Sequence, residues 1–218
     1  MKDLLAGIIS LLLLAAPAWA CGVAVCIVDP ESLILPDIIT FDETAAGGGP
    51  GHLVDDVLIV GAVQFGERFA GQKVEARGSH DAVTGDAFGP LTVMAGAASQ
   101  NLSVVRFMGT SWLNGYGVAG FPKRDAQGEG AIAVLFDTDQ SGLSLHIRGG
   151  ETGRAEVTFL RRDGALLARV PVSPLGEFAF GFVRAQGGAD IAGIVITNTD
   201  PQGIALDTIR FGKPPDLS

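Results

Sequence analysis

Cysteine, tyrosine and tryptophan are scarce in this chain of 218 residues, which has two cysteines, one tyrosine and two tryptophans. Basic residues are also in the minority, because 15 lysines and arginines stand against 24 acidic residues and leave a net charge of -9. A negative protein repels phosphate backbones and anionic lipid, and no basic stripe offsets this charge. We therefore expect no nucleic-acid partner and no binding to an anionic membrane surface.

Catalytic signatures are missing as well. His52, His80 and His146 lie far apart, without the histidine spacings of zinc sites. Ser111 lacks the Gly-x-Ser-x-Gly elbow of hydrolases, and no two glutamates form a paired acidic signature on one strand. We predict that the chain is not an enzyme. The remaining enzymatic hypothesis is a hydrolase in which His80 or His52 meets an acid and either Ser111 or a second acid in one cleft.

The first twenty residues have the pattern of a signal peptide. Lys2 is followed by the apolar run Leu4–Ala16 and by Ala18-Trp19-Ala20, whose small residues suit signal peptidase. The run is too short for a spanning helix, so we expect cleavage near Ala20 and no transmembrane segment in the mature chain. The predicted location is periplasmic, at the cell surface or released.

Cys21 and Cys26 are the only cysteines. In an oxidising compartment, two cysteines five residues apart can close a small disulfide loop, which is our first interpretation. The alternative is that Cys21 is the acylated first residue of a lipoprotein.

Short apolar runs separated by Gly, Asp, Asn and Pro clusters predict an all-β chain, since no helical period extends over a whole window. Strands at roughly ten-residue spacing indicate an antiparallel β-sandwich, which we place at residues 37–212, after a signal peptide helix (1–20) and an N-terminal extension with the cysteine pair (21–36). Residues 73–90 are expected to form a long loop and 213–218 a frayed tail. The predicted strands are Asp37–Phe41, Val57–Phe65, Leu102–Phe107, Ala131–Phe136, Leu143–Arg148, Ala155–Arg161, Leu166–Val172, Phe178–Val183, Ile194–Asn198 and Ile204–Phe211.

Five segments resemble secreted bacterial proteins with a galactose-binding-like jelly-roll domain of the PEP-CTERM-associated type. They are Val63–Gln72 (VQFGERFAGQ), Gly128–Asp137 (GEGAIAVLFD), Asp139–Leu145 (DQSGLSL), Ile191–Asp200 (IAGIVITNTD) and Ile204–Phe211 (IALDTIRF). The resemblance implies a sandwich of jelly-roll type. The C-terminal sorting signal of such proteins is missing here, and the resemblance implies a fold more directly than a function.

Calcium is the cofactor that the acidic residues suggest. Asp137 and Asp139 lie in Asp-Thr-Asp-Gln-Ser-Gly, which matches the first half of a calcium loop but has Arg148 where an EF-hand needs glutamate. The alternative is a strand that ends at Phe136, followed by a hairpin turn. The resemblance adds Asp42 and Asp207, since jelly rolls of that kind often hold a structural calcium where the first and last strands meet.

The stretch from Gly109 to Gly117 holds Trp112, Asn114 and Tyr116 close together. Sugars stack on flat aromatic rings while nearby amides bind their hydroxyls, so these three residues are the predicted ligand-binding set. The alternative is that both rings are buried and anchor the loop.

Two functional hypotheses follow. The first is a secreted, non-catalytic β-sandwich that binds carbohydrate or extracellular matrix material, with structural calcium as an option. The second is a structural or protein-interaction protein of the envelope or matrix, without glycan binding.

Overall fold

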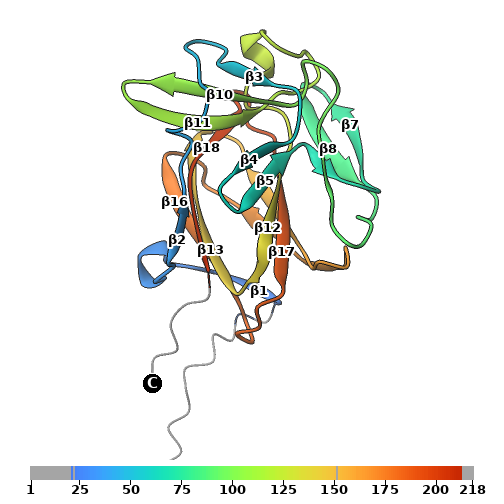
Figure 1. Ribbon diagram of the computed structural model, residues 1–218, viewed down its shortest axis with the longest axis vertical. Helices are drawn as coiled ribbons and strands as arrows, with labels where there is room; N and C mark the ends of the chain where they lie inside the picture. Colours follow the sequence, from blue (N-terminus) through green and yellow to red (C-terminus); the bar gives the residue numbers. More distant parts are fainter. Residues whose placement is uncertain (1–20, 22, 151, 213–218) are drawn as a thin grey trace, which may run out of the picture.

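Two antiparallel sheets packed face to face make up most of this computed structural model, which describes residues 21, 23–150 and 152–212 (Figure 1). The eight-stranded sheet runs in the order β1 (Val25–Val28), β16 (Phe178–Arg184), β13 (Gly142–Gly149), β18 (Ile204–Gly212), β11 (Thr110–Gly115), β10 (Leu102–Phe107) and β3 (His52–Val54), with β2 (Asp37–Ile39) also paired to β18. The six-stranded sheet runs in the order β15 (Leu166–Val172), β14 (Ala155–Leu160), β17 (Ile191–Asn198), β12 (Ile132–Gln140), β5 (Val63–Gly66) and β4 (Leu58–Val60).

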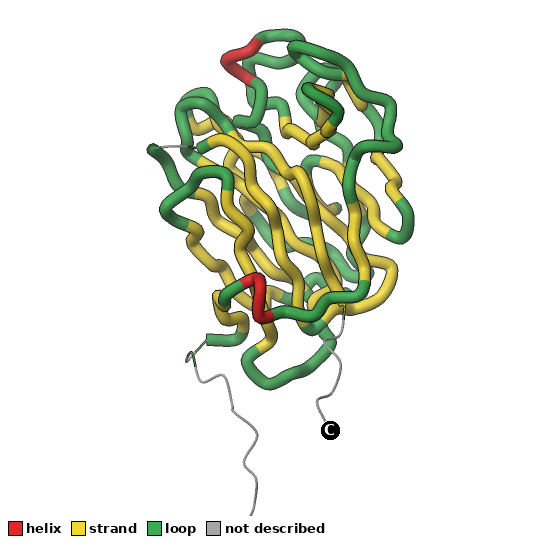
Figure 2. The backbone as a smooth tube through the Cα atoms, turned by 90° about the vertical axis from the view of Figure 1, so that its left-hand side faces the viewer, coloured by secondary structure: helices red, strands yellow, loops and turns green. Residues whose placement is uncertain are grey.

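Two small hairpins and two short turns of helix complete the described chain. They are β6 (Arg68–Phe69) with β9 (Val93–Met94), β7 (Lys73–Arg77) with β8 (His80–Thr84), η1 (Pro30–Ser32) and η2 (Arg124–Ala126). Figure 2 shows the long strands side by side, with the loops gathered at the two ends of the sandwich. The predicted antiparallel sandwich of jelly-roll type is confirmed.

The core lies between the sheets and follows from the period-two pattern of the strands. In β14, Val157 and Phe159 are fully buried, whereas Glu156 and Thr158, which alternate with them, are partly exposed. Side chains from both inner faces form one cluster, in which the rings of Phe136 and Phe211 have centroids 5.0 Å apart. Each fully buried side chain of this size contributes about 1.5–3 kcal/mol to folding.

The chain changes sheets at Ser141, where a hairpin turn was one of the two sequence interpretations. β12 does not end at Phe136 but continues to Gln140 in the six-stranded sheet, and β13 starts at Gly142 in the eight-stranded one. The hairpin interpretation is wrong, because β12 and β13 lie in different sheets and do not pair with each other. The alternation of apolar residues in a sequence does not show which sheet a strand joins. Asp163 and Gly164 lie in the turn that joins β14 to β15, where Gly164 has φ 86°.

Two further segments differ from the sequence expectations. Residues 73–90, expected to be a loop, contain the β7–β8 hairpin, whose side chains are mostly exposed or half-buried. The extension 21–36 supplies β1, which pairs with β16 along its whole length and so belongs to the sandwich.

Cys21 and Cys26 form a disulfide across a Cα–Cα distance of 5.8 Å. This disulfide is the first of the two interpretations, and acylation of Cys21 stays a prediction. The predicted signal peptide (1–20) and frayed tail (213–218) lie outside the described residues. Among the described helices, none is both long and apolar enough to span a bilayer.

Candidate functional site

A cavity of about 510 Å³ lies on the outer face of the eight-stranded sheet, over β10, β11, β13 and β18. Leu113 and Leu206 of this sheet point into the core, so the alternating positions Trp112, Asn114 and Ala205 face outward. The β10–β11 hairpin places this surface at the opposite end of the molecule from β1 (Figure 1). The lining residues are Gly48, Gly49, Val105, Arg106, Phe107, Trp112, Asn114, Arg124, Gln127, Arg148, Gly149, Glu177, Gln202, Gly203, Ile204 and Ala205.

Trp112 is half-buried and has the guanidinium of Arg148 over its ring, 4.4 Å from the ring centroid. Arg148 is held there by Asp207, with 3.1 Å between Nη1 and Oδ2, and by the exposed Glu177, with 3.7 Å between Nη2 and Oε1. A cation over an indole face is attracted by the ring quadrupole, which contributes about 0.5–2 kcal/mol. This contact stabilises the observed position of the indole on the cavity floor.

Asn114 lies on the same floor and is 4% exposed. Its Nδ2 is buried and finds no acceptor in the part of the chain that the structure describes. An unpaired buried donor costs about 1–3 kcal/mol, so most such donors in proteins have a partner. A ligand oxygen in the cavity is the kind of acceptor that this amide lacks.

Tyr116, the third predicted ligand residue, is fully buried. Its hydroxyl donates to the carbonyl of Pro50 at 3.0 Å, and its ring packs edge-on against Phe121. Burial also raises the pKa of this phenol. The ring is thus closed to a ligand, contrary to its predicted role, because the loop of residues 45–51 covers it.

This covering loop is held along β10. The Gly47 N–H donates to Val104 O at 3.1 Å, and the Arg106 N–H donates to Gly47 O at 2.8 Å. Gly51 has φ 88°, and a Cβ there would lie 2.9 Å from Val104 O, so only glycine fits. On the other side, Gln127 Nε2 donates to Gly49 O at 3.2 Å and ties the loop to the segment after η2. The rim of the cavity is therefore built from fixed backbone.

A second cavity of about 520 Å³ adjoins the first and shares Arg124, Gln127 and Gln202 with it. Asp125 and Glu129 also line this second space.

The four predicted calcium residues do not gather in one place. Asp42 Oδ1 accepts from the Ser111 N–H, Asp207 is paired with Arg148, and Asp139 Oδ1 accepts from Arg162 Nε at 2.7 Å. Asp137 is exposed at the far end of β12. Within the described ranges, no group of three or more metal-ligating side chains could hold an ion. Calcium binding stays a prediction, which a change in melting temperature with EDTA would test.

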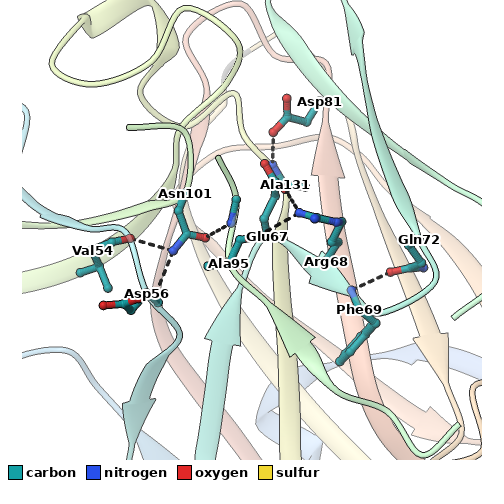
Figure 3. Close-up of polar contacts among 11 residues, drawn as sticks. Val54, Asp56, Glu67, Arg68, Phe69, Gln72, Asp81, Ala95, Asn101 and Ala131 are labelled. Carbon is teal, nitrogen blue, oxygen red and sulfur yellow. Dashed lines mark hydrogen bonds and ion pairs between the residues drawn. The ribbon is translucent and has the colours of Figure 1, made fainter. Parts of the chain in front are cut away.

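A buried polar cluster that the sequence analysis did not identify lies around the β5–β6 connection and β8 (Figure 3). Glu67 is 5% exposed and pairs with Arg68 Nη1 at 2.5 Å, and Arg68 also donates to Ala95 O. Asp81 is equally buried, and its Oδ2 accepts from the Ala131 N–H at 3.1 Å. These residues come from separate stretches of sequence, so no local pattern marked them as a group.

Comparisons with known proteins give remote similarities only. No protein-family model and no curated protein matches the chain. Among solved structures, the chain is similar to CsCBM6-3 from Clostridium stercorarium in complex with cellobiose, at 13% identity and a TM-score of 0.31, covering 51% of this chain and 82% of that one. It is also similar to a mutant of a carbohydrate binding module of family 29, at 12% identity and a TM-score of 0.33, covering 54% and 81%. Similarities this remote do not identify a ligand, so what the cavity can bind follows only from the side chains that line it.

Proposed function

We propose that this chain is an exported, non-catalytic β-sandwich that binds carbohydrate in the cavity above Trp112. The observation that carries the proposal is the fixed, half-buried indole on the floor of a cavity of about 510 Å³. Ligand sites usually measure about 300–1,000 Å³ and combine apolar rings with a few oriented polar groups.

The neighbours of Trp112 supply both kinds of surface. Val105 and the exposed ring of Phe107 extend the apolar floor, and Asn114 contributes an amide without a protein partner. The C–H face of a sugar packs on such rings, while its hydroxyls bind the amide.

The absence of catalysis is part of the proposal, and the contacts of Ser111 and His80 support it. Ser111 Oγ accepts from Arg106 Nε at 2.9 Å, while His80 Nε2 lies 2.8 Å from the backbone oxygen of Asp200. Both side chains are therefore engaged with other groups, which supports a role other than catalysis.

The test is affinity electrophoresis of the protein through gels that contain bacterial, algal and plant polysaccharides. We expect at least one polymer to retard the protein. Trp112→Ala should abolish that retardation, while the control Phe88→Ala, which removes an exposed aromatic ring outside the cavity, should keep it. No retardation by any polymer, or equal retardation of the Trp112 variant, would contradict the proposal.

The protein-interaction hypothesis has one observation of its own. Met108, at the tip of the β10–β11 hairpin, is 89% exposed and follows Phe107, which is 63% exposed. If this tip is the functional surface, Met108→Ser should remove binding to a protein partner and leave every glycan interaction intact.

A further inference from the structure

The chain has a net charge of -9, yet arginine is the main charged residue type at this cavity. Arg124 and Arg148 both line it, and Glu177 is the only acidic residue in the lining. The charge of Arg148 is offset by Asp207 and Glu177, so an excess positive charge here has to come from Arg124. An unpaired positive charge on an acidic protein attracts anions locally.

Arg124 is the arginine with the most freedom to bind a ligand. It is exposed on η2, and its guanidinium makes no hydrogen bond or ion pair with any residue that the structure describes. Arg106 is already engaged, since it donates to Ser111 Oγ and to the backbone oxygen of Asp42. Arg148 is stacked on Trp112 and paired with Asp207. Arg124 therefore brings an uncompensated positive charge to the rim.

Two hydrogen-bond donors of the cavity lining have no acceptor in the described chain. They are the Asn114 Nδ2 and the guanidinium of Arg124, which offers donors but no acceptor. Such donors match a ligand that carries anionic oxygens, to which arginine binds with its planar fork.

From this combination we infer that the ligand is an acidic polysaccharide, whose sugar ring packs against Trp112 while its carboxylate or sulfate group binds Arg124. The inference rests on the proposed carbohydrate binding and narrows it to one class. The adjoining cavity has the opposite character, because Asp125 and Glu129 line it. The anionic group is thus expected in the first cavity, which Arg124 and Arg148 both line.

The experiment compares polymers that differ in charge alone. Polygalacturonate is paired with its methyl-esterified form, and dextran sulfate with dextran, so that carboxylate and sulfate are tested separately. Affinity electrophoresis is run at about 150 mM salt, where long-range attraction between exposed charges is screened. We expect retardation by one acidic polymer and about tenfold weaker binding to its neutral partner.

Three variants identify the site. Arg124→Gln should weaken binding to the acidic polymer about tenfold and leave binding to the neutral polymer unchanged. Trp112→Ala should weaken both, and Arg77→Gln, which removes an exposed arginine on β7, should weaken neither. Because Arg124 has no partner in the described chain, its variant should melt at the wild-type temperature.

Each contrary result has a distinct meaning. Equal binding to acidic and neutral polymers, lost in the Trp112 variant, would overturn the acidic class and leave carbohydrate binding standing. Binding to the acidic polymer that Arg124→Gln does not weaken would also overturn the inference, since the charge would act elsewhere. Binding to no polymer at all would overturn both the inference and the function on which it rests.

Discussion

Replacing Asp81 with asparagine should make the protein more stable at neutral pH. The Asp81 side chain is 5% exposed, and burial is the largest cause that raises its pKa to about 6. Glu67 and Glu129 raise this pKa further, while the hydrogen bond from the Ala131 N–H and the nearby His80 lower it. The folded protein thus holds an ionised carboxylate in a place that disfavours its charge.

The direction of the pH effect follows from the raised pKa of Asp81. Because this carboxyl binds its proton more tightly in the folded state, its ionisation lowers the free energy of unfolding as the pH rises from about 4 to about 6. The ordinary pKa is 3.8, and one pH unit corresponds to about 1.4 kcal/mol, so the full effect above this range is about 3 kcal/mol. Asparagine removes this cost and keeps an oxygen that can accept from the Ala131 N–H.

Urea denaturation at about pH 7.5 and about pH 4 measures the effect in both proteins. We expect the Asp81→Asn protein to gain about 2–3 kcal/mol at the higher pH and almost nothing at the lower one. Asp137→Asn, at an exposed aspartate, is the matched control and should change neither value. A loss of stability of equal size at both pH values would refute this reasoning, because the carboxylate would then act only through its hydrogen bond.

Three further changes test the covering loop, the core and the N-terminal strand. Tyr116→Phe removes the hydrogen bond to Pro50 O and should lower the free energy of unfolding by about 1 kcal/mol in urea denaturation. No loss of stability would mean that this bond does not hold the covering loop. Phe136→Ala empties a fully buried core position and should cost about 3–5 kcal/mol by the same measurement, so a loss below about 1 kcal/mol would contradict the described packing. Reduction of the Cys21–Cys26 disulfide opens a short loop and should lower the free energy of unfolding by about 2 kcal/mol, as measured by calorimetry. An unchanged melting temperature would show that β1 is held by its pairing with β16 alone.

The sequence was informative about the strands whose apolar residues alternate or cluster. Leu102–Phe107 and Leu166–Val172 were predicted with the bounds that the structure has. The β7 strand, Lys73–Arg77, was missed because it packs little apolar surface and is defined by its pairing with β8. Val57–Phe65 was expected as one strand, but Gly61 has φ 57° and turns the chain between β4 and β5.

The candidate site was predictable only in part, because it depends on which distant segments the fold brings together. Trp112 and Asn114 were identified from one stretch of sequence, and both face the cavity. Tyr116 lies on the same face of the strand, but its burial depends on a loop more than sixty residues away, with Pro50 66 positions earlier in the chain. Arg124 and Arg148 come from separate elements, so the positive lining exists only in the folded chain.

The most direct test of the central claim is the emission of Trp112 during titration with a polysaccharide that retains the protein. Protein that starts at Cys21, after the expected cleavage, has Trp112 as its only tryptophan, so that the signal reports the cavity floor alone. We predict a saturable change in emission, with a midpoint equal to the dissociation constant from an independent binding measurement. Saturable binding that leaves the Trp112 emission unchanged would place the carbohydrate elsewhere on the molecule and contradict the account.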